Sequence, residues 1–266
     1  MTDPADALAA GPQLEHLLST FHLTTAATEI VPRLLAAGHE ELLPLLLDIF
    51  ALERQDRDQR RVDRLRQASK LPPGKTFASF QQGHLPKPLA SKLHELARAA
   101  FLQRAVNVLA FGLPGTGKSH AACALGHALI EAGHSVLFTP TFKLVQDLLV
   151  AKRDLQLPRA LRKLDSFELL ILDDLGYVQQ APEEIEVLFT LLAERYERRS
   201  LLITSNLVFS QWERIFKNPM TTAAAIDRLV HHCVILEFDL PSYRTQQPAT
   251  PQTLAEPAPQ LSSKRK

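Results

Sequence analysis

The chain has 266 residues, and its 30 Lys and Arg side chains nearly balance 29 Asp and Glu, which leaves a formal charge of +1. This balance excludes a histone-like, wholly basic binder but leaves room for local basic patches. The two cysteines exclude a disulfide scaffold and a four-cysteine zinc site, and they indicate a reducing compartment. The acidic N-terminus lacks a signal peptide's basic start, and no apolar run is long enough to span a bilayer. We therefore expect a cytoplasmic protein without a membrane partner.

Residues 1–70 carry leucine and isoleucine at helical spacing, which predicts a small all-helical N-terminal domain. The end of its last helix, residues 54–70, holds seven basic side chains and three acidic ones. Four arginines step by three and four residues and share one helix face: Arg54, Arg57, Arg61 and Arg64. This face predicts DNA contacts, with a solvated helix face as the alternative. A second basic cluster precedes a later apolar strand and is a second candidate for DNA contacts: Lys152, Arg153, Arg159, Arg162 and Lys163.

Residues 71–104 read as a linker, which starts at a Pro-Pro-Gly turn, followed by an amphipathic helix over 88–104. In residues 105–245, short apolar strands alternate with helical patterns, and the last helix is expected over 221–233. This alternation predicts an α/β domain with a parallel sheet between helices. Residues 246–266 are rich in Pro, Gln, Ser and Thr and are expected to be disordered.

Residues 112–119 match the phosphate-loop pattern GxxxxGK[ST] at every fixed position, between an apolar strand and a helix. Glycines let the backbone wrap around phosphate oxygens, and the N–H groups at the helix start bind negative charge. We expect ATP here, with Lys118 at the β- and γ-phosphates and Ser119 supplying a hydroxyl to Mg²⁺. The expected ATP contacts are Gly112, Leu113, Pro114, Gly115, Thr116, Gly117, Lys118, Ser119 and His120.

An apolar strand at residues 169–172 ends in two carboxylates. In a phosphate-loop enzyme the first acid, Asp173, would hold Mg²⁺, and the second, Asp174, would polarise the attacking water. The strand–helix unit between the loop and these acids indicates that another strand separates them in the sheet. The strand at 201–204 fits that place and puts Asn206 at its end as a polar sensor of the γ-phosphate. A capping asparagine is the alternative.

Two late arginines and a histidine pair also stand out. Arg228 has the place of an arginine finger offered to a neighbouring subunit, with a surface Asp–Arg pair as the alternative. Arg244 could fold back onto the phosphates or lie in solvent. His231 and His232 resemble metal ligands, but adjacent residues on the expected helix point apart and no second cluster completes a site, which argues against a metal.

Six stretches in order resemble the IstB-like transposition helper ATPases of bacterial insertion sequences, relatives of the DnaC helicase loader in the AAA+ class. They are residues 107–120, 169–177, 196–206, 209–212, 225–233 and 242–244. The similarity covers roughly residues 14–244. It implies an AAA+ ATPase domain at 105–245 behind an N-terminal domain for DNA binding and assembly. One departure is Asp174, where AAA+ enzymes usually have Glu; its shorter reach would slow hydrolysis.

The resemblance also implies the function. Such helpers bind ATP and duplex DNA, assemble into homo-oligomers with ATP sites at subunit interfaces, and recruit and stimulate a partner transposase. It assigns Arg228 as the arginine finger acting in trans and Arg244 as a second sensor. The alternatives are a DnaC-type replicative helicase loader and an ATP-dependent DNA scaffold with negligible hydrolysis.

Overall fold

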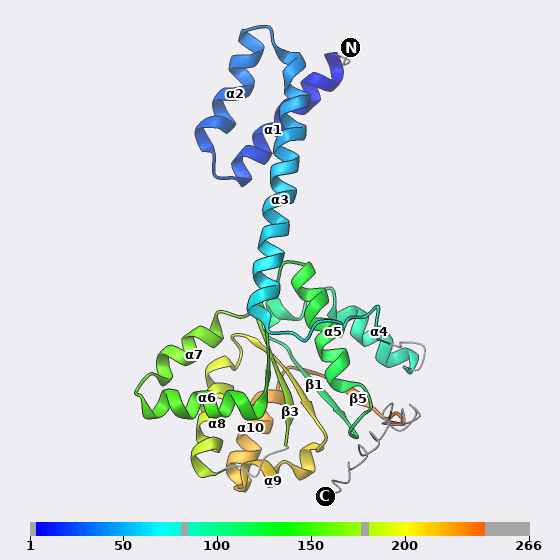
Figure 1. Cartoon of the computed structure of the whole chain (residues 1–266), viewed down its shortest axis with the longest axis vertical. Coiled ribbons are helices and arrows are strands. Elements are labelled where there is room, and N and C mark those ends of the chain that lie inside the picture. The colour runs from blue at the N-terminus through cyan, green and yellow to red at the C-terminus, as the bar shows by residue number, and fades with distance from the viewer. Residues whose placement is uncertain (1–3, 81–84, 177–180, 243–266) are drawn as a thin grey trace, which may run out of the picture.

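The computed structural model describes residues 4–80, 85–176 and 181–242. A helical N-terminal part and an α/β part lie at opposite ends of one long helix (Figure 1). The N-terminal elements are α1 (Pro4–Thr20), α2 (Thr24–Ala36), the 3₁₀ turn η1 (Glu40–Leu42) and α3 (Leu43–Ser69). Leu14, Leu18, Val31 and Leu43 form the buried centre of this part. Only the first half of α3 packs there, and its second half runs down to the α/β part.

The α/β part is a five-stranded, wholly parallel sheet with the order β2-β3-β4-β1-β5. Its strands are β1 (Asn107–Gly112), β2 (Val136–Pro140), β3 (Leu169–Leu175), β4 (Ser200–Ser205) and β5 (Cys233–Phe238). Its helical elements are α4 (Lys87–Leu96), η3 (Leu102–Arg104), α5 (Lys118–Glu131), α6 (Thr141–Arg153), α7 (Leu157–Asp165), α8 (Pro182–Arg195), η4 (Phe209–Gln211), α9 (Glu213–Phe216) and α10 (Pro219–Val230).

Helices cover both faces of the sheet. Leu125 and Leu129 of α5 pack on one face together with α4. Leu148 of α6 and Leu191 of α8 pack on the other, together with α7 and α10. Strands buried on both faces need continuous apolar sequences, which explains the Leu- and Ile-rich runs. The predicted fold class, an α/β domain preceded by a small helical one, is confirmed.

The strand order also confirms that β4 lies between β1, which leads into the phosphate loop, and β3, which carries the two acids. The carboxyl ends of all three strands therefore meet at one edge of the sheet. Polar groups from β3 and β4 are brought beside the loop at that edge.

Two expected helices have different ends. The helix expected over 88–104 stops at Leu96, because Ala99 and Ala105 adopt left-handed backbone angles of φ 64° and 50°, which leaves only the short turn η3 between them. The helix expected over 221–233 spans Pro219–Val230 and is capped by the side chain of Asn218. It must end there because Cys233 already pairs with Asn107 in the sheet.

The lower half of α3 is anchored to α5. Arg61 Nη2 donates to the carbonyl oxygen of Gly133 at 3.0 Å, and Arg66 Nη2 lies 2.6 Å from Glu131 Oε1. Lys70, at φ 55°, ends α3 before the prolines of the linker. None of the described helices combines the length and apolar character needed to cross a membrane.

Candidate functional site

The phosphate loop leaves β1 at Gly112 and enters α5 at Lys118. Gly112 pairs with Phe238 of β5, and a Cβ at Gly112 would lie 2.5 Å from the Phe238 carbonyl oxygen. No larger residue fits unless β5 moves away from the start of the loop. Gly115 and Gly117 take left-handed angles of φ 83° and 97°, which glycine adopts at no steric cost. The sequence pattern therefore reflects real backbone needs of this turn.

Lys118 is buried inside the curl of the loop. Its Nζ donates to the carbonyl oxygens of Gly112 and Leu113, both at 2.8 Å, and Thr116 Oγ1 also donates to Leu113 O at 2.9 Å. The ammonium and the N-terminal end of α5 thus place positive charge at the same point. This arrangement fits a bound polyphosphate.

The linker crosses the first turn of α5 beside the loop. His120 Nε2 lies 3.3 Å from the carbonyl oxygen of Thr76 and 3.2 Å from Ser79 Oγ, and the ring of Phe80 packs on the imidazole at 4.8 Å. Burial lowers the pKa of His120, which favours the neutral ring. The predicted nucleotide contact at His120 thus also holds residues 76–80 against α5.

Asp173 ends the regular part of β3, and a buried threonine of β4 fixes its carboxylate. Thr204 Oγ1 donates to Asp173 Oδ1 at 2.6 Å and accepts from the backbone N–H of Asp174 at 2.9 Å. Thr141 Oγ1 donates to the Asp173 carbonyl oxygen at 2.9 Å. Sequence reasoning overlooked both threonines. The sequence could have predicted the role of Thr204, since the strand at 201–204 was already expected beside the acidic strand.

Asp174 lies in an irregular step of the β3–β4 pairing, between Leu172 and Leu175, and its side chain is exposed. Its backbone is left-handed, with φ 58°. Asp adopts this region several times more readily than most residues, because its short polar side chain forms local hydrogen bonds. The backbone therefore offers a physical reason for Asp where related ATPases usually have Glu.

Asn206 follows β4 directly and is half-buried. Its Oδ1 would lie 3.5 Å from a Cβ at Gly176, the residue that follows β3. Ser205 Oγ holds the two strand ends together by donating to Leu175 O at 2.7 Å. The fold thus brings Asn206 beside the segment that carries Asp174. Whether Asn206 senses phosphate or only shapes this turn stays a prediction.

The donors at this edge of the sheet suit a magnesium nucleotide. Ser119 offers a hydroxyl and Asp173 a carboxylate, the hard oxygen ligands that Mg²⁺ takes together with phosphate and water. Mg²⁺ would neutralise phosphate charge there. Ser119 and Asp173 are the residues that would hold it.

Arg228 is half-buried and packs within its own chain. Its guanidinium lies 4.8 Å from the ring centroid of Phe189 on α8, and Nη1 donates to Ala224 O at 2.9 Å. Within the described residues no ion pair joins Arg228 to Asp227, so the alternative of a surface pair does not hold. Arg244 lies outside the described residues, as does the segment 246–266.

The arginine face of α3 continues the apolar stripe that packs against α1 and α2. Arg57 lies over the ring of Phe21 at 4.4 Å and pairs with Glu53 at 2.5 Å, while Arg61 bonds Gly133. Arg64 Nε donates to the carbonyl oxygen of Arg60 at 3.3 Å. Of these arginines, Arg61 joins the two parts, whereas Arg57 and Arg64 bond within the N-terminal part and α3 and all four side chains remain exposed, so their DNA contacts stay a prediction.

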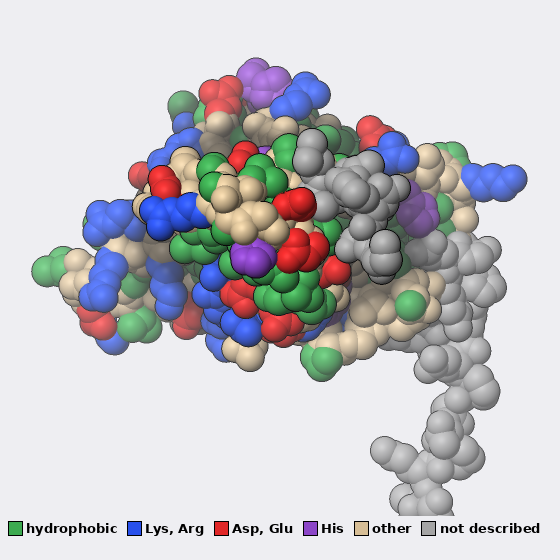
Figure 2. Space-filling view, turned by 90° about the horizontal axis from the view of Figure 1, so that it is seen from above, with side chains coloured by type: hydrophobic (Ala, Val, Ile, Leu, Met, Phe, Trp, Pro, Cys, Tyr) green, Lys and Arg blue, Asp and Glu red, His purple; other side chains and the backbone are tan. Residues whose placement is uncertain are grey.

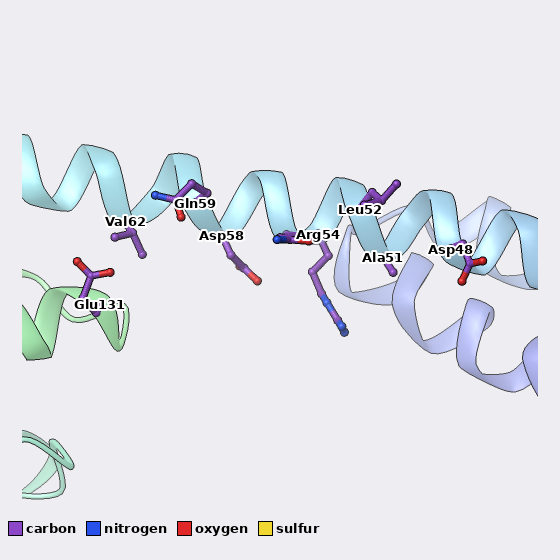
Figure 3. A pocket seen from close by; sticks show the side chains of 9 residues that line it. Asp48, Ala51, Leu52, Arg54, Asp58, Gln59, Val62 and Glu131 are labelled. Carbon is purple, nitrogen blue, oxygen red and sulfur yellow. The ribbon is translucent and has the colours of Figure 1, made fainter.

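Arg54 lines a groove of about 760 Å³ along α3, between the N-terminal helices and α5. Figure 3 shows Arg54 and Asp58 projecting from α3, with Glu131 facing Val62 at one end. Asp48 adds a third carboxylate to this lining. Three acids and one arginine make the groove a poor site for DNA.

The second basic cluster lies on α6 and α7. Lys152 pairs with Glu186 at 2.6 Å, and Arg153 with Asp154 at 3.2 Å. Three further side chains are exposed and form no ion pair within the described residues: Arg159, Arg162 and Lys163. Figure 2 shows Lys and Arg side chains along the side of the molecule on which α6 and α7 lie in Figure 1.

Comparison with known proteins decides the family. The family model described as IstB-like ATP binding protein matches residues 7–250. The chain belongs to this IstB-like family. Its relatives include an insertion sequence ATP-binding protein of Sinorhizobium fredii, 51% identical over 195 residues, which are 72% of this chain and 65% of that protein. The ATP-binding protein of insertion sequence IS21 from Pseudomonas aeruginosa is 37% identical over 238 residues, or 88% of this chain and 89% of the relative.

Solved structures resemble the IstB-like chain in fold. The structure of DnaI matches with a TM-score of 0.51 at 19% identity. The match covers 64% of this chain and 95% of the DnaI chain. The structure of the replication initiator DnaA, bound to AMPPCP and single-stranded DNA, matches with a TM-score of 0.54 at 17% identity. The match covers 65% of this chain and 52% of the DnaA chain. These likenesses confirm the AAA+ fold of the α/β part.

Proposed function

We propose that this IstB-like protein is a DNA-dependent ATPase that assembles on target DNA and recruits and stimulates the transposase of its insertion sequence. The observation that supports it best is one edge of the sheet, where the phosphate loop and the hydrogen-bonded group of Asp173, Thr204 and Asp174 follow neighbouring parallel strands. Relatives named as insertion sequence ATP-binding proteins support the transposition context.

The proposed reaction is hydrolysis of ATP to ADP and phosphate. Lys118 contacts the β- and γ-phosphates, and Ser119 and Asp173 hold Mg²⁺. Asp174 accepts a hydrogen bond from the attacking water, and Asn206 contacts the γ-phosphate. Arg228 completes the site of a neighbouring subunit, and this requires its guanidinium to leave the ring of Phe189 on assembly.

Binding to duplex DNA is proposed for the exposed basic side chains of α7, with Lys152 and Arg153 of α6 at the edge of the contact. Arg159, Arg162 and Lys163 lie on one short helix without acidic partners in the described chain, so their full charge is available to phosphates. The contact has few groups that read bases, so binding is expected to be largely independent of sequence.

The test combines ATP hydrolysis with DNA binding. Reversing Arg159, Arg162 and Lys163 to Glu should weaken DNA binding by about tenfold or more and flatten its salt dependence by about 2–3 units. ATP affinity without DNA should not change. The matched control changes Arg57, Arg61 and Arg64 on α3 to Glu, which alters the net charge of the protein by the same amount. An effect on DNA in the control alone would move the proposed contact to α3.

Two other functions make different predictions. A replicative helicase loader would stimulate loading of a helicase and leave the transposase unaffected. A DNA scaffold would release no more phosphate than a Lys118→Ala variant, with or without DNA. Stimulated transposition together with DNA-dependent phosphate release excludes both.

A further inference from the structure

A histidine–glutamate cluster lies at the edge of the sheet opposite the phosphate loop. Glu197 lies just before β4, and His231 and His232 lie just before β5. On a continuous helix two adjacent histidines would point apart, but α10 ends at Val230. In the turn that follows, the two imidazole rings lie 4.3 Å apart between centroids. The structure thus removes the geometric objection to a shared ligand.

The backbone under this cluster is firmly held. Asn107, at the start of β1, donates its backbone N–H to His232 O at 2.8 Å and its side-chain amide to Leu229 O at 3.2 Å. Its side-chain oxygen accepts from Leu201 N at 3.0 Å. One buried asparagine therefore fixes both turns that carry the cluster, and it does so without using their side chains.

The distances suit a small cation. One ligand atom from each of Glu197, His231 and His232 lies within 4.8 Å of the other two. His231 Nδ1 is 3.5 Å from Glu197 Oε1 and 3.3 Å from the hydroxyl of Tyr196. Two tetrahedral zinc ligands at about 2.0–2.2 Å from the metal are separated by about 3.4 Å. Small rotations of exposed side chains reach that geometry.

Among the neighbouring groups, the Tyr196 hydroxyl lies 3.3 Å from His231 Nδ1 and is hydrogen-bonded to Glu197, so a bound cation would displace it from both side chains. Arg198, next to Glu197, forms ion pairs with Asp165 at 2.6 Å and Glu194 at 3.5 Å rather than with Glu197. Cys233 is half-buried in β5 and packs on the apolar core, and burial raises the pKa of its thiol. The ligand set is therefore two imidazoles and one carboxylate.

We propose that Glu197, His231 and His232 form a surface site for a divalent transition metal of the Zn²⁺ type, with water completing four ligands. Imidazole with carboxylate selects zinc over the magnesium that serves the nucleotide. The metal would join the turn before β4 to the turn before β5. It would thereby hold the end of α10, two residues beyond Arg228.

The experiment titrates Zn²⁺ into metal-free, untagged full-length protein by calorimetry, with Mg²⁺–ADP saturating the nucleotide site. The wild type should bind one equivalent that is lost, or weakened at least tenfold, in His231→Ala and in Glu197→Gln. Co²⁺ in place of Zn²⁺ should give the visible absorption of a four-coordinate site. Fluorescence of the buried Trp212 checks that each variant is folded.

The matched control is His39→Ala. His39 Nδ1 lies 3.4 Å from Glu41 Oε1, and both side chains are 58% exposed, close to the 50% and 55% of His231 and Glu197. Among the residues that the structure describes, no third ligand joins His39 and Glu41. The control should keep the wild-type equivalent. Equal Zn²⁺ binding by the wild type and both cluster variants, or none by the wild type, overturns the proposal.

Discussion

Replacing Thr204 by Val isolates one hydroxyl that orients both acids. Valine keeps the shape of threonine but can neither donate to Asp173 Oδ1 nor accept from Asp174 N, and Thr204 has no exposed surface through which water could substitute. An unsatisfied buried amide costs about 1–3 kcal/mol, and a lost hydrogen bond to a carboxylate about 1.5–3 kcal/mol. Because Asp173 is only half-buried, we expect a net loss of about 2–4 kcal/mol.

Stability can be measured by urea unfolding with Trp212 as the probe. It is the single tryptophan of the chain, is buried in the α/β part, and donates to Leu207 O just beyond β4 at 3.0 Å. With a urea slope of about 2 kcal/mol/M, the midpoint should fall by about 1–2 M. The N-terminal helices contribute nothing to this signal.

Activity should separate from binding in the same variant. ATP affinity should stay within a few-fold, because the loop is untouched, while hydrolysis should slow by about 10–100-fold, since the hydroxyl that positions the carboxylate proposed to hold Mg²⁺ is lost. Thr204→Ser keeps the hydroxyl and is the control. A valine variant with the wild-type midpoint and turnover would refute the role assigned to this hydroxyl.

Four further predictions follow from particular contacts. Asp174→Asn suits the same left-handed backbone, so it should bind ATP normally and slow hydrolysis strongly, and loss of binding would make Asp174 structural. Arg228→Ala should hydrolyse poorly yet recover activity when mixed with Lys118→Ala protein; mixed oligomers without recovery would exclude a role in trans. Arg195→Met should cost about 3 kcal/mol or more by urea unfolding, because the buried guanidinium donates to Leu164 O, Phe167 O and Ser200 O, and a smaller loss would mean that water replaces these bonds. Burial would raise the pKa of Glu168, but hydrogen bonds from His134 and Ser135 outweigh it and lower that pKa below 4.5. Glu168→Gln should therefore cost about 1 kcal/mol at pH 7, and the difference from the wild type should vanish as pH falls through the lowered pKa, whereas a difference that is constant with pH would contradict this linkage.

The sequence was informative where one local rule decides the structure. Apolar runs gave the five strands, and the glycine pattern gave the loop, because close packing against Phe238 and left-handed angles leave few other choices. The order of β1, β4 and β3 followed from one intervening strand–helix unit. The strands and the left-handed glycines depend on residues close together in the chain, whereas the contact of Gly112 with Phe238 does not.

Prediction from the sequence failed where a contact with a residue far away in the chain determines the structure. The stripe of Arg54, Arg57, Arg61 and Arg64 does lie on one helix, and its DNA contacts stay a prediction; what the sequence could not show is that Arg57 lies over Phe21 and that Arg61 bonds Gly133, both far away in the chain. The end of α10 at Val230 was missed because pairing of Cys233 with β1 overrides helical propensity. Thr204 was missed because its partner Asp173 lies on another strand.

The anchoring of α3 has a mechanical consequence. Helix α5 begins at the phosphate loop and ends at Glu131, and α3 rests on that far end through Arg61 and Arg66. From Arg61 to the start of α3 at Leu43 the helix rises about 27 Å at 1.5 Å per residue, and its first half carries α1 and α2. A tilt of about 10° at the anchor would therefore carry the N-terminal helices through about 5 Å. A small movement of α5 against a bound phosphate would thus produce a larger displacement of the N-terminal helices at the far end of α3.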